Sequence, residues 1–354
     1  NRNVWENRPQ RPVGPFPYDE EEVSFDNTAD GLTLAGTLTI PDGPGRHPAV
    51  ILISGSGPQD RDETLMGHKP FLVLADYLTR RGIAVLRYDD RGTAGSTGEF
   101  GGATTEDFAR DASAAVDFLK GHARINVNEI GLAGHSEGGL IAPMVVGSRD
   151  DVAFVVLLAA TGVDGTTISM TQSEAMLRAA GTDEAEIKVA KAVSRAVLEA
   201  AANSSEGADL TKDLEAAMDG VIETLPEADR EEAAKNLKRE IPNLNRKLRR
   251  KWSRFFHTYD PRPALSKISC PVLAIIGSKD VQVLPDLNMP EIEKALIQGG
   301  NSDYKMVEIE GLNHLFQQCE TGAMGEYATI QETFNAEALE SIGDWIVEHT
   351  TPVE

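Results

Sequence analysis

The sequence predicts a doubly wound, mostly parallel α/β sheet with an inserted helical cap. Short, nearly continuous apolar runs, such as residues 48–53 and 83–88, are typical of parallel strands buried on both faces. Segments with helical spacing, such as residues 70–80, alternate with these runs. Residues 166–266 are instead rich in Ala, Glu, Lys and Arg and carry no strand pattern. We therefore expect this stretch to form several helices that interrupt the alternation.

The chain opens with a proline-rich segment, residues 1–17, which we interpret as an extended linker. Its first residue is Asn1 rather than methionine, so we expect that an upstream segment has been removed. If that segment was an export signal, the protein is periplasmic or secreted, and otherwise it is cytoplasmic. Residues 22–25 and 32–40 alternate polar with apolar side chains and predict an antiparallel pair at a sheet edge.

The remaining elements follow in β/α order. A helix is expected over residues 108–119, and a strand at 130–132 leads into another helix. Further strands are expected at 152–158, 271–276 and 304–309, with a closing helix at 336–347. The α/β core then comprises residues 18–165 and 267–354, and the cap comprises residues 166–266. Within the cap, an apolar stripe at three- to four-residue spacing predicts one amphipathic helix with Leu244, Leu248, Trp252, Phe255 and Phe256 on its buried face.

Composition excludes several kinds of partner. A formal net charge of −22 argues against nucleic acid or an anionic membrane surface. No apolar run reaches the roughly 18 residues that a membrane-spanning helix needs. The two cysteines, Cys270 and Cys319, lack the spacing of a metal site. They are expected to be buried free thiols, although one disulfide between them stays open.

The stretch Gly134-His135-Ser136-Glu137-Gly138 has the pattern G-x-S-x-G between a predicted strand and a predicted helix. In this context the glycines allow a sharp turn that exposes the serine hydroxyl at the top of a sheet. Ser136 is therefore the candidate nucleophile. His135, the second residue of the turn, is expected to point its side chain away from the Ser136 hydroxyl.

A serine nucleophile needs a base and an acid that orients the base. Asp280 follows the predicted strand 271–276, and His314 follows the last predicted strand. The order Ser136, Asp280, His314 is the one used by hydrolases with this kind of sheet. Asp164, one strand earlier, is the alternative acid. Of the seven histidines, His314 alone follows a strand at the expected place.

The oxyanion of an acyl-transfer intermediate needs two backbone N–H donors. One is expected from Glu137, directly after the nucleophile, and the other from the glycine-rich loop at residues 54–62. In that loop Ser56 is the first candidate donor and Gln59 the second, and the Gln59 side chain is also expected to bind substrate. Phe255 or Phe256 is expected to line the acyl pocket and to favour short acyl chains, with core packing as the alternative.

Together these segments resemble serine esterases of the α/β-hydrolase superfamily, in the bacterial branch that includes dienelactone hydrolases and serine aminopeptidases. The resemblance rests on residues 54–62, 134–139, 259–261, 271–280 and 313–316. It also includes the turn at residues 89–96, which departs from the D-x-R-G-x-G-x-S pattern at Ala94. There Asp89 and Arg91 are expected to form a structural ion pair.

The resemblance implies hydrolysis of a small-molecule carboxylic ester through an acyl-enzyme intermediate, without a metal or an organic cofactor. Two alternatives would use the same three residues: an aminopeptidase or amidase, and a thioesterase or acyltransferase. A third is a hydrolase fold that has lost catalysis and acts as a binding module. The sequence leaves the natural substrate, the choice of ester or amide, and the oligomeric state open.

Overall fold

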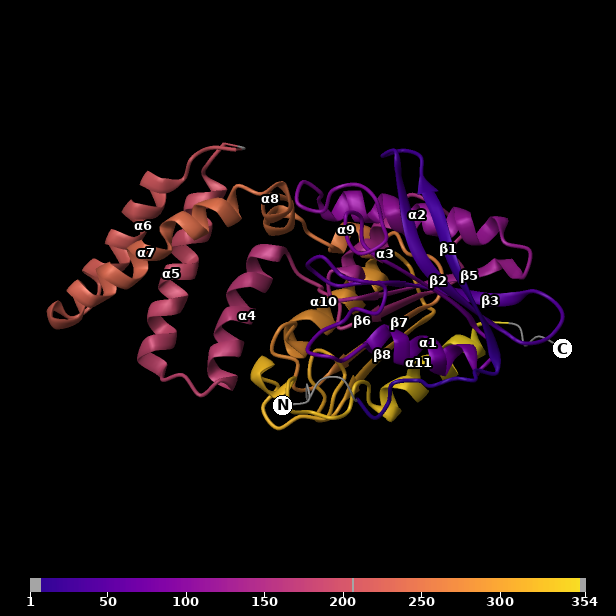
Figure 1. Cartoon of the computed structure of the whole chain (residues 1–354). Coiled ribbons are helices and arrows are strands. Elements are labelled where there is room, and N and C mark those ends of the chain that lie inside the picture. Colours follow the sequence, from indigo (N-terminus) through magenta and orange to yellow (C-terminus); the bar gives the residue numbers. More distant parts are fainter. Residues whose placement is uncertain (1–7, 206, 351–354) are drawn as a thin grey trace.

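The computed structural model describes residues 8–205 and 207–350, which are built around one eight-stranded sheet (Figure 1). The strand order is β1-β2-β4-β3-β5-β6-β7-β8. The hairpin β1–β2 and the pair β2–β4 are antiparallel, and all other neighbours are parallel. The strands are β1 (Tyr18–Asn27), β2 (Leu32–Pro41), β3 (His47–Ile53), β4 (Ala84–Tyr88), β5 (Ile125–His135), β6 (Val155–Leu158), β7 (Val272–Gly277) and β8 (Tyr304–Ile309).

Helices cover both faces of the sheet. One face packs against α1 (Pro70–Thr79) and α11 (Ala336–Glu348), and the other against α2 (Thr105–Gly121), α3 (Gly138–Val146) and α10 (Pro285–Gln298). The short helix α9 (Arg262–Leu265) and the 3₁₀ turn Met324–Glu326 lie in connections. Every residue of β3, β4 and β7 is buried, as the continuous apolar runs predicted. The predicted fold class is confirmed, and residues 22–25 do pair with residues 32–40 in an antiparallel hairpin at the sheet edge.

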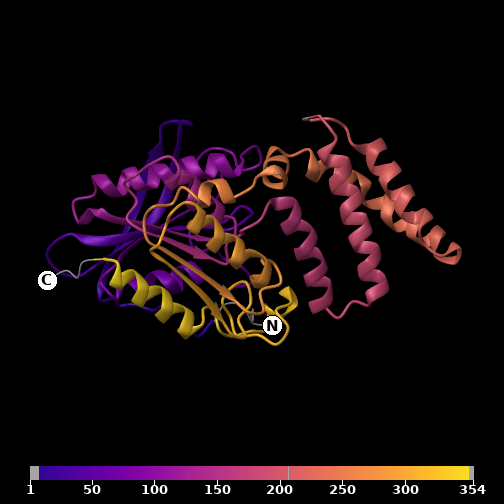
Figure 2. The ribbon, with the colours of Figure 1, turned by 180° about the vertical axis from the view of Figure 1, so that it is seen from behind.

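A helical insertion follows β6 and comprises α4 (Gly165–Ala179), α5 (Glu184–Ala202), α6 (Thr211–Glu223), α7 (Arg230–Leu248) and α8 (Lys251–Thr258), with a 3₁₀ turn at Glu227–Asp229. Figures 1 and 2 show it projecting from one end of the sheet, with α6 and α7 farthest out. It has a small apolar core of its own, in which Leu214 and Met218 are fully buried. Helices α4 and α8 are the ones that connect it to the rest of the molecule.

The apolar stripe of the insertion does not lie on one helix, so that prediction was wrong. Helix α7 ends at Leu248 and α8 begins at Lys251, with Arg250 in an extended conformation between them. The break has a physical reason, because the two halves of the stripe pack on different bodies. Leu248 belongs to the core of the insertion, whereas the indole of Trp252 is bonded to Glu137 at the edge of the sheet.

Several smaller expectations can be compared with the structure. Cys270 and Cys319 are free thiols, Cys319 buried and Cys270 half-buried. Of the proline-rich segment, residues 1–7 lie outside the described residues. Arg8 is buried and donates to backbone carbonyls that include Met66 O at 2.8 Å, so the described part of this segment begins docked on the core. None of the helices in the described ranges is long and apolar enough to cross a bilayer.

Candidate active site

Ser136 lies on the sharp turn between β5 and α3, with its backbone in the left-handed region at φ 54°. The flanking glycines are required by close packing. A Cβ on Gly134 would overlap the carbonyl oxygen of Gly138, and a Cβ on Gly138 would overlap that of Ile53. Such a strained turn presents the serine hydroxyl at the carboxyl edge of the sheet, as expected for a nucleophile.

Asp280 and His314 meet at the same edge. Asp280 follows β7, His314 follows β8, and the His314 Nδ1 lies 2.7 Å from the Asp280 Oδ2. The other carboxylate oxygen of Asp280 accepts the N–H groups of Gln282 at 2.8 Å and Val283 at 2.9 Å. These bonds fix a carboxylate that is only 1% exposed. The imidazole is thereby oriented with its Nε2 free to act as a base.

Ser136 and His314 line one cavity of about 390 Å³. The structure shows no hydrogen bond between the two side chains among the described residues. Catalytic bonds of this kind are often long without substrate and tighten when it binds. The alternative acid, Asp164, is the N-cap of α4 and accepts the Thr167 N–H at 2.9 Å and the Thr167 hydroxyl at 2.8 Å. Its carboxylate caps the first turn of α4, and its two hydrogen bonds among the described residues are to Thr167 rather than to a histidine.

The loop after β3 passes directly against the nucleophile. A Cβ placed on Gly55 would lie 3.2 Å from the Ser136 Cβ, so only glycine lets the loop come this close without a shift. Ser56, Gln59 and Glu137 also line the cavity. In the described part of the chain, neither the Ser56 nor the Glu137 backbone N–H donates to a protein acceptor. The Gln59 amide donates weakly to Ser56 O at 3.3 Å.

The side chain of Glu137 has a role that the sequence did not reveal. Its carboxylate is 3% exposed and accepts from the Trp252 indole, the Thr105 hydroxyl and the Ser56 hydroxyl, each at 2.7 Å. Burial raises the pKa of Glu137, and these three donors oppose that shift. Because Trp252 lies on α8, its bond to Glu137 ties the helical insertion to the residue that directly follows the nucleophile.

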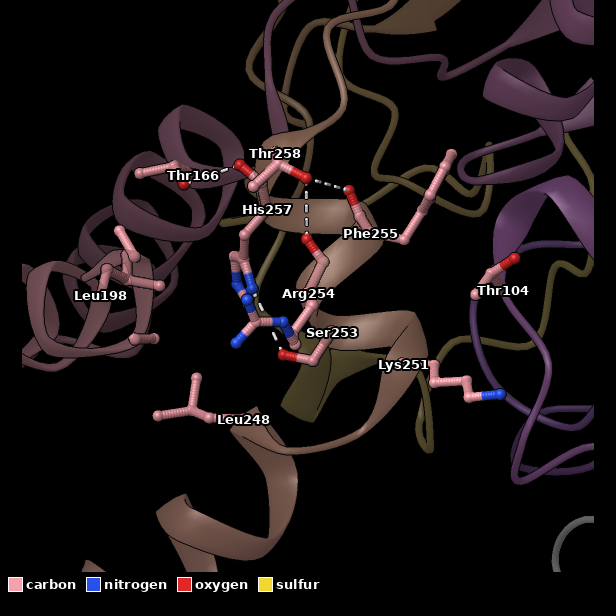
Figure 3. A pocket seen from close by; sticks show the side chains of 12 residues that line it. Thr104, Thr166, Leu198, Leu248, Lys251, Ser253, Arg254, Phe255, His257 and Thr258 are labelled. Carbon is pink, nitrogen blue, oxygen red and sulfur yellow. Dashed lines mark hydrogen bonds between the residues drawn. The ribbon is translucent and has the colours of Figure 1, made fainter. Parts of the chain in front are cut away.

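The structure places Phe255 and Phe256 on different sides of α8. Phe256 lines the cavity that contains Ser136, where its ring stacks on Trp252 with centroids 4.9 Å apart. Phe255 lines a second cavity of about 380 Å³ between α8 and α5, shown in Figure 3. His257 contributes to both cavities and bonds to the hydroxyls of Ser169 and Ser253 at 3.1 and 3.3 Å.

The position of His135 differs from the expectation that its side chain points away from the Ser136 hydroxyl. His135 lines the same cavity as Ser136, and its ring centroid is 4.7 Å from that of His314. Its Nδ1 lies 2.8 Å from the carboxylate of Glu63. Glu63, at φ 53°, is a second residue that the sequence analysis missed. No local pattern marks it, because the pairing joins residues far apart in the chain.

The turn after β4 braces the loop at residues 54–62. Asp90 accepts the Ser54 hydroxyl and the Gln59 N–H, both at 2.8 Å, and burial raises the pKa of Asp90 to about 8. The expected ion pair between Asp89 and Arg91 is not formed. Asp89 instead pairs with Arg61 at 2.9 Å, and Arg91 with Asp111 on α2 at 2.6 Å.

The partners of Asp89 and Arg91 come from two neighbouring segments: Arg61 lies in the loop at residues 54–62, and Asp111 lies on α2. Ala94 adopts the positive φ of 44° where the pattern has glycine. The turn therefore keeps the backbone shape that the pattern implies, at the cost of some strain on a non-glycine residue.

The chain is similar to known proteins in sequence and in fold. A family model described as X-Pro dipeptidyl-peptidase (S15 family) matches residues 30–290. Esterase EstD of Thermotoga maritima is 35% identical over 147 residues, which are 42% of this chain and 34% of that protein. The match thus spans about a third of the length of this curated relative.

Solved structures are similar over nearly the whole chain. An esterase of Pyrococcus furiosus has a TM-score of 0.53 at 16% identity, covering 96% of this chain and 97% of the other. An α/β-hydrolase of Penicillium sp. sh18 has a TM-score of 0.55 at 19% identity, covering 94% and 99%. A hypothetical protein of Pseudomonas aeruginosa has 0.56 at 17%, covering 98% and 97%. At such identities the likeness shows the shared α/β-hydrolase fold.

Proposed function

The chain belongs to the X-Pro dipeptidyl-peptidase (S15) family and has the α/β-hydrolase fold, and we propose that it is a serine hydrolase of carboxylic esters with short acyl chains. One observation carries the proposal. His314, held by Asp280, and the strained Ser136 turn face a single cavity of about 390 Å³, large enough for a small ester. The similarity to Esterase EstD supports ester chemistry over the part of the chain that is matched.

In the proposed mechanism, His314 Nε2 takes the Ser136 proton as the Ser136 oxygen attacks the ester carbonyl carbon. The tetrahedral oxyanion accepts the backbone N–H groups of Glu137 and Ser56. Collapse of the intermediate expels the alcohol, which receives the proton from His314. Water then attacks the acyl-enzyme with His314 again as base, and Asp280 keeps the proton of the imidazole on Nδ1 throughout.

The charges around the cavity favour a neutral substrate over a peptide. A dipeptidyl-peptidase must hold the ammonium group of its substrate, which calls for an unoccupied carboxylate. The two carboxylates that line the cavity are those of Glu63 and Glu137. Glu63 is already paired with His135 and the Gly55 N–H, both through Oε1, and Glu137 accepts three side-chain donors. An ammonium group would therefore have to share a carboxylate that already has partners.

The remaining lining is apolar or uncharged, which suits a small ester with a polar alcohol. Besides the residues discussed above, it includes Leu65, Thr161, Ile168, Gln172, Gln282, Val283, Leu315 and Met324. Apolar side chains can take the acyl chain, while the amides and hydroxyls can bond to the alcohol part. Phe256 is the proposed limit on acyl length, because it is the aromatic of the two that faces Ser136.

Steady-state kinetics test the proposal. Esters of p-nitrophenol with C2 to C12 acyl chains are compared with aminoacyl- and dipeptidyl-anilides and with acyl thioesters, and Ser136→Ala serves as the control. We expect the highest kcat/KM on C2 to C4 esters and a loss on the order of 10⁴-fold in Ser136→Ala. A higher kcat/KM on dipeptidyl-anilides or thioesters would replace the ester assignment with one of the alternatives.

A further inference from the structure

His135 and Glu63 form a buried pair beside His314, and the mechanism above uses neither of them. The exposed fractions are 6% for His135 and 5% for Glu63. The His135 Nδ1 lies 2.8 Å from Glu63 Oε1, and its Nε2 lies 2.9 Å from the backbone carbonyl oxygen of His314. Both ring nitrogens therefore face an oxygen atom.

The identity of these oxygens indicates where the protons are. A carbonyl oxygen can only accept, so the His135 Nε2 must carry a hydrogen. Glu63 Oε1 already accepts the Gly55 N–H at 2.7 Å, and an ionised carboxylate oxygen can take a second N–H donor. If Nδ1 donates to it as well, both nitrogens are protonated and the ring is an imidazolium.

The electrostatic surroundings agree with this protonation state. Burial is the largest single influence and lowers the pKa of His135, but Glu63 and the other acceptors around the ring together raise it, and the net shift of the pKa is upward. The other groups that act on the ring are the His314 carbonyl and the more distant carboxylate of Asp280. His349 also lies between a carbonyl and a carboxylate, but the exposed Asp303 is 3.5 Å away from it. His135 is the histidine for which both contacts are short and enclosed.

We propose that Glu63 holds His135 as an imidazolium at neutral and mildly alkaline pH, and that this cation is a positioning residue for His314. The inference rests on the proposed function, since it assigns a role in that same site. The cation does two things. It donates to the His314 carbonyl oxygen and so fixes the loop after β8, and it places a positive charge beside the His314 ring, whose centroid is 4.7 Å from that of His135.

The same pair connects three loops of the site. Glu63 holds the Gly55 N–H, next to the proposed oxyanion donor Ser56. His135 directly precedes the nucleophile, and its Nε2 holds the main chain of His314. The loops after β3, β5 and β8 thus share one buried ion pair. Removing its charge should change the pH dependence of catalysis as well as stability.

Nuclear magnetic resonance on the wild-type protein tests the protonation state directly. With ¹⁵N-labelled histidine, long-range ¹H–¹⁵N spectra at pH 8.5 report the protons on each of the seven imidazoles. We expect one ring, His135, to have both nitrogens protonated, although a free histidine is neutral at that pH. His68 is an internal control, because burial lowers its pKa and it should be neutral. If all seven rings are neutral at pH 8.5, the proposal is wrong, whatever the protein hydrolyses.

The pH profile of kcat/KM then tests the positioning role. His135→Gln keeps an N–H that can reach the His314 carbonyl but removes the positive charge. We expect the acid limb of the profile to move to higher pH by on the order of one unit, because a positive charge beside the catalytic base is removed. His68→Gln, a substitution of another buried histidine that does not line the cavity, should leave the acid limb in place.

The spectrum tests the protonation state of His135, and the pH profile tests its positioning role, so the two parts of the proposal can fail independently. An unchanged acid limb in a folded His135→Gln variant would overturn the positioning role. If that variant does not fold, Glu63→Gln takes its place, and the spectrum of the wild-type protein still decides the protonation state. Glu63→Gln should turn the doubly protonated ring into a neutral one at pH 8.5, and a ring that stays doubly protonated would contradict the role of Glu63.

Discussion

At the scale of single residues, the site depends on a few side chains whose hydrogen bonds leave no freedom of orientation. Asp280 accepts from His314 and from two backbone N–H groups. Both carboxylate oxygens of Asp164 also accept hydrogen bonds, but both bonds come from Thr167 in the first turn of α4. The two aspartates follow neighbouring strands of the sheet, so they provide a matched comparison.

Asp280→Asn should lower kcat on the order of 10⁴-fold, because the amide no longer selects the His314 tautomer with its proton on Nδ1. Asp164→Asn should cost only about 1 kcal/mol of stability or less, as for a helix cap, and leave kcat nearly unchanged. Kinetics on the best p-nitrophenyl ester, with thermal unfolding as the folding check, measure both. The reverse ranking would assign the acid to Asp164.

Asp90 predicts a pH dependence of stability. Its pKa of about 8 in the folded protein lies well above that of an aspartate in an unfolded chain, so the folded state binds the extra proton. This contribution is fully present below about pH 4 and is lost as the pH rises towards 8. In Asp90→Asn the amide oxygen can accept the Gln59 N–H while the amide NH₂ donates to the Ser54 hydroxyl oxygen, so both contacts persist without an ionisable group. The free energy of unfolding of the wild-type protein should therefore fall relative to Asp90→Asn between pH 5 and 8, as urea denaturation measures, and parallel curves would refute this account.

At the scale of elements, α8 separates two cavities with opposite faces. Trp252 and Phe256 line the cavity that contains Ser136, whereas Phe255 lines the other cavity, where Figure 3 shows its ring on the Thr104 side of α8, away from Leu198 of α5. The sequence could place these aromatics on one apolar stripe but could not choose between pocket and core. That choice depends on the break at residues 249–250, which arises from tertiary contacts and has no glycine or proline to announce it.

Phe256→Ala should shift the preferred acyl chain of the ester panel to greater length, because it enlarges the cavity next to Ser136. Phe255→Ala should leave the chain-length profile unchanged and lower stability. The ratio of kcat/KM for C8 and C2 esters measures the effect. Equal profiles for the two variants would mean that Phe256 packs the protein without limiting the substrate.

At the scale of the whole molecule, two bodies with separate apolar cores meet beside the nucleophile. The insertion packs around residues such as Met218, and the sheet packs between its two helix layers. One hydrogen bond across this junction joins the Trp252 indole to the buried Glu137 carboxylate. Within the α/β core, the Thr105 hydroxyl of α2 donates to the same oxygen of Glu137. The position of the insertion is thus linked to the residue next to Ser136.

The contacts at this junction predict different outcomes for the loss of each of two hydrogen-bond donors to Glu137. Trp252→Phe and Thr105→Val each remove one donor to Glu137 and should each destabilise the protein by about 1–3 kcal/mol. Only Trp252 lines the cavity, so only Trp252→Phe should change KM or the chain-length profile. Chemical denaturation and the ester panel measure both quantities. A change in profile with Thr105→Val as well would mean that Glu137, rather than the indole, sets selectivity.

Sequence reasoning accounts for much of this architecture, and its gaps have physical causes. The parallel strands and the order of Ser136, Asp280 and His314 could be predicted because they depend on local periodicity and on fixed turn chemistry. The partners of Asp89 and Arg91 could not, since charged residues in one turn have many candidates across the fold. Glu63 was missed for the same reason, because it meets His135 only after the sheet is assembled.

The central claim is that Ser136 is an activated nucleophile, and covalent labelling tests it most directly. The folded protein is treated with a fluorophosphonate probe, and the adduct is located by mass spectrometry of the intact chain and its peptides. We predict one adduct per chain on Ser136, no adduct in Ser136→Ala, and much slower labelling in Asp280→Asn. Absence of labelling in the wild-type protein, or an adduct on another serine, would contradict the account.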